Sequence, residues 1–233
     1  MPAFLKNITP FYGTGEKNSA GQSLEEFLEA YDPYKYKNPC CTTDTVVFSY
    51  REGKVKDPDG LKVLMVKRSN HPSIGFWALP GGFVNLEEDL DDTARRELEE
   101  ETGVSGLTIE QFACYGDYRR DPRARVITTA YMALVEEEKI TVEAGDDASD
   151  AAWCTVSLRT TEDKEEGGWR IRDYILSLEN EEKGIRTKAC IQKKERGNLI
   201  REKKYSVTDG GVIAVDHAAI ITQALEILNA RIG

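Results

Sequence analysis

The sequence predicts an α/β fold in which a mixed β-sheet lies between helices. Three features indicate this fold: several short segments rich in β-branched and aromatic residues, an amphipathic helix in the middle of the chain, and an apolar helix at its end. With 233 residues, of which 40% are hydrophobic, the chain can bury one sizeable core. We therefore expect a single domain with an extension rather than two full domains.

The beginning of the chain is predicted to be an extension with one short helix. The first 22 residues show no clear period, whereas Ser23 and Glu26 have the spacing of a capping box that opens a helix ending near Tyr31. A connector containing two prolines follows. The predicted boundaries are 1–39 for the extension and 40–233 for the main domain.

The predicted strands precede and follow a central helix. A polar turn at Asp57 to Gly60 separates the first two strands and indicates a hairpin. Two apolar segments around the polar residues 180–184 predict a second hairpin, inserted within residues 158–209 and followed by a charged turn at 193–197. The expected strands are 45–50, 61–67, 76–79, 107–115, 125–135 and 151–156. The inserted hairpin joins 174–178 to 185–191. The last helix is expected to cover 216–232, with Asp216 as its N-cap.

The central helix is predicted from about Asp89 to Thr102. Its apolar residues Leu90, Ala94 and Leu98 recur at every fourth position and form a stripe that can pack on a sheet. Gly103 follows in the position where a glycine commonly ends a helix. One face of this helix should therefore be buried.

A neighbouring face of the same helix is strongly acidic. At about 100° per residue, Glu97, Glu100 and Glu101 fall within roughly 100° of arc. Like charges at this spacing repel by a few tenths of a kcal/mol per pair, so a cation is expected among them. Carboxylate oxygens suit Mg²⁺ or Mn²⁺, which take further ligands from water and substrate phosphates. A solvated acidic face is the alternative.

Composition excludes several classes of protein. Thirty-one basic residues against 41 acidic ones give a net charge of −10, which disfavours binding to nucleic acid or an anionic membrane. The sequence has no apolar run of about 20 residues, and its N-terminus lacks a basic region followed by an apolar one, so we expect a cytoplasmic protein. The five cysteines contain no C-x-x-C pair, and neither histidine lies in a nucleophile motif. We expect His217 to be a packing or capping residue.

The spacing of the acidic segment matches a family signature. Gly82 is followed after five residues by Glu88, after seven more by Arg96 and Glu97, and then by Leu98, Glu100, Glu101, Gly103 and Val104. This pattern resembles the signature of the Nudix hydrolases. The resemblance implies a Nudix-type α/β/α sandwich, a bound Mg²⁺ or Mn²⁺, and hydrolysis of a nucleoside diphosphate linked to another group. It also implies a homodimer, and we expect the insertion to cover a partner subunit or the cleft, unless it is a solvated loop.

The resemblance also implies roles for the residues of this segment. Glu97, Glu100 and Glu101 would be catalytic metal ligands, helped by the backbone at Gly81, while Arg96 would pair with Glu88 or another acid in a structural role. A further carboxylate is needed as base or extra ligand. Asp147 is our candidate, with Asp146, Asp150 and Glu143 nearby, and Glu97 or Glu100 as alternatives.

Other stretches resemble one branch of this family, the ADP-ribose pyrophosphatase-like hydrolases. They include residues 66–69, 76–84, 120–125, 144–148 with Trp153, and 214–218. The expected reaction converts ADP-ribose, or a related nucleoside diphosphate sugar, to a nucleoside monophosphate and a sugar phosphate. Guanidinium groups suit phosphate and ribose oxygens, and a glycine permits close approach of the backbone. The candidates for substrate contact are Arg68, Gly82, Arg120, Arg123 and Arg125, with Lys67, and those for stacking on adenine are Phe4, Tyr12, Tyr34 and Tyr118.

Two alternative functions stay open at this point. The acidic segment also serves enzymes that cleave oxidised nucleoside triphosphates, and it cannot distinguish the two substrate classes. Some proteins of this branch instead sense ADP-ribose and regulate transcription through a winged-helix domain. Because the sequence stops at Gly233, directly after the last predicted helix, and the acidic segment retains all its expected ligands, we expect no such domain and favour the enzyme.

Overall fold

The computed structural model describes residues 4–51, 60–140, 142 and 148–232. The chain divides into two compact units, Met1–Asn38 and Pro39–Gly233. The first unit contains a 3-10 helix, Thr9–Phe11, and helix α1, Leu24–Ala30. The capping box of α1 is present as expected, because the Ser23 hydroxyl accepts from the Glu26 N–H at 3.2 Å and the Ser23 N–H donates to the Glu26 carboxylate at 2.7 Å.

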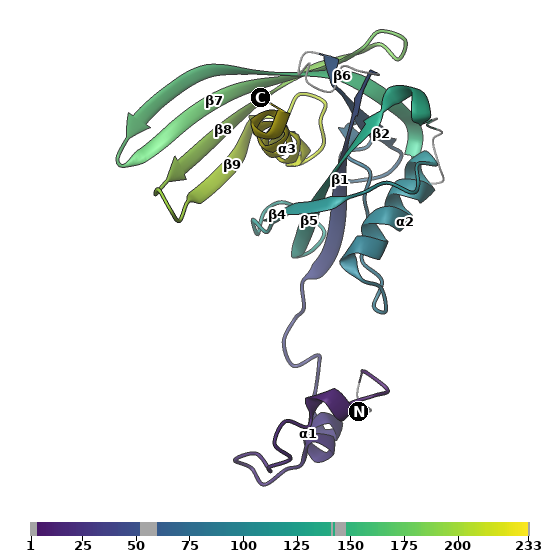
Figure 1. Cartoon of the computed structure of the whole chain (residues 1–233), viewed down its shortest axis with the longest axis vertical. Coiled ribbons are helices and arrows are strands. Elements are labelled where there is room, and N and C mark those ends of the chain that lie inside the picture. Colours follow the sequence, from purple (N-terminus) through teal and green to yellow (C-terminus); the bar gives the residue numbers. More distant parts are fainter. Residues whose placement is uncertain (1–3, 52–59, 141, 143–147, 233) are drawn as a thin grey trace. The chain divides into compact units, whose positions relative to one another are not determined.

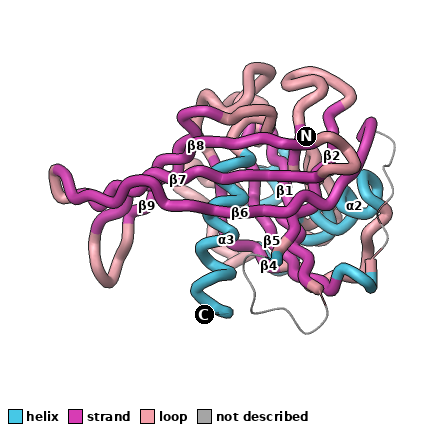
Figure 2. The backbone as a smooth tube through the Cα atoms, turned by 90° about the horizontal axis from the view of Figure 1, so that it is seen from above, coloured by secondary structure: helices cyan, strands magenta, loops and turns pink. Residues whose placement is uncertain are grey.

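The second unit is built on one curled sheet (Figures 1 and 2). Within the described residues the sheet has nine strands in the order β4-β5-β1-β2-β6-β7-β8-β9, with β3 paired to β2. The strands are β1 (Cys40–Tyr50), β2 (Lys62–Arg68), β3 (Trp77–Ala78), β4 (Glu110–Tyr115), β5 (Val126–Glu136), β6 (Ala148–Glu166), β7 (Trp169–Asn180), β8 (Ile185–Arg196) and β9 (Glu202–Asp209), and the helices are α2 (Leu90–Thr102) and α3 (His217–Ile232), with a short 3-10 turn at Glu137–Lys139.

The sheet is mixed, as the sequence predicts. β1 runs parallel to β5, whereas β1 pairs antiparallel with β2 over Phe48–Ser49 and the remaining neighbours are also antiparallel. Side chains of β1 alternate between two cores. Val46 and Phe48 belong to a cluster with Ile221 of α3, while Val47 packs with Leu98 of α2.

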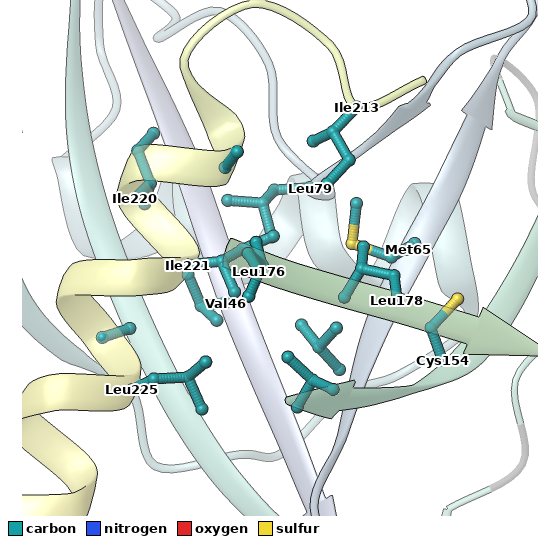
Figure 3. Close-up of a cluster of buried hydrophobic side chains, with 14 of the residues drawn as sticks. Val46, Met65, Leu79, Cys154, Leu176, Leu178, Ile213, Ile220, Ile221 and Leu225 are labelled. Atoms are coloured by element: carbon teal, nitrogen blue, oxygen red, sulfur yellow. The ribbon is translucent and has the colours of Figure 1, made fainter. Parts of the chain in front are cut away.

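The two helices therefore cover opposite faces of the sheet, which confirms the α/β/α arrangement. Figure 1 shows α3 within the curve of the sheet and α2 beyond β1 on the other side. Figure 3 shows Ile221 and Leu225 of α3 turned towards Val46 and Leu176 in the larger core. Burial of this apolar helix face fixes the start of α3 next to strands β1 and β3, where the candidate site lies.

Helix α2 has the bounds that its sequence predicts. It begins after Asp89 and ends at Gly103, whose φ of 70° is left-handed and whose N–H donates to the Glu99 carbonyl at 2.8 Å. Ala94 and Leu98 are buried. The helix thus holds its buried stripe against the sheet and leaves the neighbouring acidic face beside the loop that follows β3.

The inserted segment is larger than the predicted hairpin. The strands β7 and β8 do form the expected pair, but β6 continues to Glu166 and β9 adds a further strand, so a four-stranded antiparallel extension results (Figure 2). The charged turn predicted at 193–197 is wrong for most of its length. Lys193 lies inside β8 and is 5% exposed. Its charge is tolerated there because its ammonium donates to the Glu226 carboxylate at 2.9 Å. The turn begins only at Gly197, whose φ is 87°.

The last helix has the expected position. Helix α3 begins at His217, and the backbone carbonyl of the preceding Asp216 accepts from the Ile220 N–H at 3.2 Å, as that of an N-cap residue does. The Asp216 carboxylate forms an ion pair with Arg120. In the described part of the chain, no helix has both the length and the hydropathy needed to span a bilayer.

Candidate active site

The acidic face of α2 borders a cavity of about 410 Å³. Its walls come from β1, the end of β2, the loops around β3, helix α2, the loop before β5 and the start of α3. Segments far apart in sequence therefore meet here. The candidate residues that line the cavity are Lys67, Arg68, Gly81, Gly82, Arg96, Glu97, Glu101, Arg120 and Arg123.

Two carboxylates of α2 dominate the chemistry of this cavity. The Glu101 carboxylate accepts from the Gly81 N–H at 2.9 Å. Burial, together with the negative charges of Glu97 and Asp44, raises the pKa of Glu101 to about 8. The hydrogen bond from the Gly81 N–H opposes this shift. Burial also raises the pKa of Glu97, although Arg96 opposes the shift. The surroundings thus disfavour the ionised forms of both acids, and a cation would stabilise those forms.

The glycines at the entrance of α2 allow the backbone to approach these acids closely. A Cβ atom on Gly81 would lie 2.0 Å from the Thr43 carbonyl oxygen, and one on Gly82 would lie 2.3 Å from a Glu97 carboxylate oxygen. Both distances are far below van der Waals contact. Gly81 is therefore required by the backbone of Thr43, whereas a side chain at position 82 would displace the Glu97 carboxylate.

Arg96 fixes the arrangement of the acids, as expected for a structural residue. Its Nε donates to Glu88 at 2.8 Å, and its Nη1 donates to Glu97 at 2.7 Å and Glu100 at 2.9 Å. Glu88 also accepts from the Thr93 hydroxyl at 2.8 Å. The hydrogen bonds from Arg96 and Thr93 lower the pKa of Glu88 to about 2, so this acid stays ionised.

Glu100 lies apart from the other two predicted ligands. Its side chain is 56% exposed, turns towards Arg96, and does not line the cavity. Over residues 4–51, 60–140, 142 and 148–232, no three His, Cys, Asp or Glu side chains are already gathered as a complete metal shell. The pair Glu97 and Glu101 nevertheless fits a hard divalent cation, because both offer oxygen donors and both carry a raised pKa.

Arg120 does not have the free guanidinium that a substrate ligand would need. Its side chain is 6% exposed, and it donates through Nε and Nη2 to the two Asp216 oxygens, both at 2.9 Å. Its Nη2 also lies 3.5 Å from an Asp44 oxygen. These contacts join the loop before β5 to β1 and to the start of α3. Arg120 thus has the contacts of a positioning residue.

Asp44 and His217 complete this buried network. The Asp44 carboxylate accepts from the Thr128 hydroxyl at 2.7 Å and lies 3.6 Å from Nε2 of His217. Nδ1 of His217 accepts from the Leu79 N–H at 2.8 Å, so a neutral ring carries its proton on Nε2, towards Asp44. His217 is a buried packing residue, as expected. Asp44 was not predicted, and its only sequence signal is a charge within an otherwise uncharged strand.

Of the other predicted residues that the structure describes, Arg68 and Arg123 line the cavity, whereas Arg125 and Asp150 do not. Nε of Arg68 donates to the Pro72 carbonyl at 2.7 Å, and Arg123 forms an ion pair with Asp121 at 2.8 Å. Arg125 is not brought to the cavity, because its guanidinium donates to the Gly116 carbonyl at 2.7 Å. Asp150 pairs with Lys183 away from the cavity. Asp147, Asp146 and Glu143 lie outside the described residues.

The aromatic residues proposed for adenine do not line the cavity either. Phe4, Tyr12 and Tyr34 belong to the first compact unit, and Tyr118 is exposed beside Arg119. The aromatic residue that does line the cavity is Phe83. Its place directly after Gly81 and Gly82 is the sequence signal that points to it.

Comparison with known proteins agrees with this geometry. The model of the NUDIX domain matches residues 28–174. The chain is 41% identical to the ADPR responsive transcriptional repressor NtrR of Acinetobacter baylyi over 48% of this chain and 44% of that one. It is 39% identical to the ADP-ribose pyrophosphatase of Methanocaldococcus jannaschii over 39% of this chain and 52% of that one. The chain thus spans about half the length of these curated relatives.

A solved structure shows the same likeness. The NUDIX domain of Shewanella oneidensis NrtR, complexed with ADP ribose, has a TM-score of 0.50 and is 37% identical, covering 57% of this chain and 82% of that one. The family match covers more than half of the chain and includes the loop and helix that hold Gly81, Gly82, Glu97 and Glu101. This chain belongs to the Nudix family, in the branch that resembles the ADP-ribose pyrophosphatases.

Proposed function

We propose that this chain is a Nudix pyrophosphohydrolase that cleaves the diphosphate of ADP-ribose, or of a related nucleoside diphosphate sugar, with Mg²⁺ or Mn²⁺. The products would be a nucleoside monophosphate and a sugar phosphate. The observation that carries the proposal is the pair of partly buried carboxylates with raised pKa values, Glu97 and Glu101, facing a cavity beside the backbone of Gly81 and Gly82.

The substrate is proposed from the relatives. One is named an ADP-ribose pyrophosphatase, and a solved Nudix domain of similar sequence holds ADP ribose. The cavity also has the cations that a diphosphate requires. Lys67 and Arg68 both line it, and the Arg68 guanidinium matches the geometry of phosphate oxygens.

The chemistry assigned to the residues follows from their charges. A divalent cation, when bound, neutralises the diphosphate and lowers the pKa of a water molecule. Glu97 and Glu101 would hold it, with the backbone at Gly81 close by, and Arg96 would keep Glu97 in place. A carboxylate must accept a proton from the attacking water. Asp147 remains our candidate for this base, with Glu97 or Glu100 as the alternatives.

The direct test is to incubate the protein with ADP-ribose and Mg²⁺ and to identify the products by ³¹P NMR. We expect AMP and ribose 5-phosphate. Glu101→Gln should reduce turnover by at least about 100-fold while the circular dichroism spectrum is unchanged. Glu99→Gln is the matched control, because Glu99 lies on the exposed side of the same helix and does not line the cavity.

Two results would contradict the proposal. One is normal turnover by the Glu101→Gln variant. The other is a lack of cleavage of ADP-ribose and other nucleoside diphosphate sugars, combined with cleavage of nucleoside triphosphates. The second result would favour the pyrophosphohydrolase of oxidised triphosphates.

A sensing function is the second candidate, because a relative is named an ADPR responsive repressor. In that case ADP-ribose should bind without being hydrolysed, and the Glu101→Gln variant should bind it as well as the native chain does. The presence of a homodimer and a cytoplasmic location remain predictions, and sedimentation analysis would test the first.

A further inference from the structure

Phe83 is the one Phe, Tyr or Trp among the described residues that line the cavity. It follows Gly82 directly, and 46% of the residue is exposed. A large aromatic residue with this exposure beside a polar cleft leaves a substantial part of its apolar surface unburied in the folded chain. It therefore has surface available for a ligand.

The backbone around Phe83 is held from both sides. Phe83 forms a bridge with Thr42 of β1, and the Val84 N–H donates to the Cys41 carbonyl at 3.0 Å. The Phe83 carbonyl accepts from Nη2 of Arg96 at 3.2 Å. The residue that organises the acids of α2 thus also fixes the peptide that bears this ring.

A second planar group lies against the ring. The Arg123 guanidinium is 5.4 Å from the Phe83 ring centroid. Arg123 is itself fixed by Asp121, to which Nε donates at 3.1 Å and Nη2 at 2.8 Å. The Asp121 side chain is 8% exposed, so the acid that orients Arg123 is buried. Both Phe83 and Arg123 line the cavity.

We propose that Phe83 and Arg123 form the platform on which the base of the nucleotide stacks. A nucleobase binds proteins through its flat π-face, and both an aromatic ring and a guanidinium plane provide a matching surface. In contrast, the lining contributed by Arg68, Ser69 and Asn70 is polar or charged and suits phosphate or sugar oxygens. The platform determines specificity for a nucleotide over a sugar phosphate. It rests on the proposed function in one respect, namely that the ligand is a nucleotide.

The experiment compares the binding of AMP and of ribose 5-phosphate by calorimetry, in the presence of Mg²⁺. Phe83→Leu removes the π-face but keeps an apolar side chain of similar bulk, and Phe83→Trp keeps a π-face. We expect Phe83→Leu to weaken AMP binding by about 10-fold or more, since stacking on an aromatic side chain contributes this much. Phe83→Trp should bind AMP within about 3-fold of the native chain, and ribose 5-phosphate should be unaffected by either change.

Tyr118→Ala provides the matched control. Tyr118 is 71% exposed and also has an arginine over its ring, Arg119 at 5.1 Å, but it does not line the cavity. This variant should bind AMP as the native chain does. With ADP-ribose as substrate, Phe83→Leu should raise KM and leave kcat nearly unchanged, which a general disturbance of the acids would not produce.

Three outcomes would show that Phe83 and Arg123 do not bind the base. They are equal AMP binding by the native and Phe83→Leu chains, an equal loss of AMP and ribose 5-phosphate binding, and a lack of AMP binding by the native chain. These binding measurements do not depend on turnover. A native chain that binds AMP through Phe83 without cleaving ADP-ribose would refute the proposed function and leave the platform standing.

Discussion

At the scale of single residues, the site depends on which charges are compensated and which are not. Glu88 and Asp216 have arginine partners, whereas Glu101 is buried with a single backbone N–H. Sequence spacing predicted that Glu97 and Glu101 would share a face. The contact of Glu100 with Arg96 is a local pair of residues four positions apart on one helix. The burial of Arg120 by Asp216 could not be predicted, because it depends on a residue distant in the chain.

The raised pKa of Glu101 predicts a dependence of stability on pH. Between its usual value of 4.5 and its folded value of about 8, the folded chain retains the proton and the unfolded chain has lost it. The free energy of unfolding should therefore fall as pH rises through this range, by up to about 1.4 kcal/mol per pH unit from this group. Urea unfolding at pH 6 and pH 8 in EDTA should show a smaller decrease for Glu101→Gln than for the native chain.

The same pair of proteins provides the control with metal. Mg²⁺ added at pH 8 should raise the Tm of the native chain, because a ligand that binds only the folded state stabilises it. The Glu101→Gln variant should respond much less. Equal pH dependence of the two proteins would contradict the assigned pKa.

The buried ion pair of Arg120 predicts a loss of stability. Arg120→Met leaves Asp44 and Asp216 without their guanidinium partner and should lower the free energy of unfolding by about 3–5 kcal/mol. Arg119→Met is the control, since Arg119 is 70% exposed and its ion pair should contribute at most about 1 kcal/mol. Chemical denaturation checks both values, and similar losses for the two variants would argue against the positioning role.

At the scale of secondary-structure elements, the helices with local end signals were predicted best. The capping box of α1 and the Gly103 end of α2 lie in the sequence itself. The insertion was predicted only as a hairpin, because β6 and β7 continue through charged residues that pair across strands, such as Asp163 with Arg170. Their length is set by neighbouring strands and not by an apolar pattern.

The end of α2 yields a prediction at this scale. Gly103 has a φ of 70°, so Gly103→Ala should lower the free energy of unfolding by about 1 kcal/mol through backbone strain. Gly116→Ala is the comparison, because Gly116 has no positive φ and a Cβ there would meet its nearest neighbour at 3.8 Å. Thermal unfolding should show a lower Tm for Gly103→Ala only.

At the scale of the whole molecule, alternating burial along β1 explains the layered architecture. Val46 and Phe48 face one core and Val47 the other, so a helix is needed on each side. This arrangement was predictable from the segments and their order. The pairing of β1 with β5 rather than β4 was not, because it depends on contacts between distant strands.

The division of the chain gives a prediction for the molecule as a whole. A chain that begins at Pro39 keeps the complete sheet and both of its helices. It should therefore fold with a Tm within a few degrees of that of the full chain, as measured by calorimetry. A truncated chain without a cooperative transition would show that residues 1–38 are required for the fold.

We propose that Glu97 and Glu101 together bind a divalent cation. Titration with Mn²⁺, followed by electron paramagnetic resonance, measures this binding without any substrate. We expect the native and Glu99→Gln proteins to bind Mn²⁺ and the Glu97→Gln/Glu101→Gln double variant to bind it at least about 10-fold more weakly. Equal Mn²⁺ binding by all three proteins would show that these two carboxylates do not hold the cation.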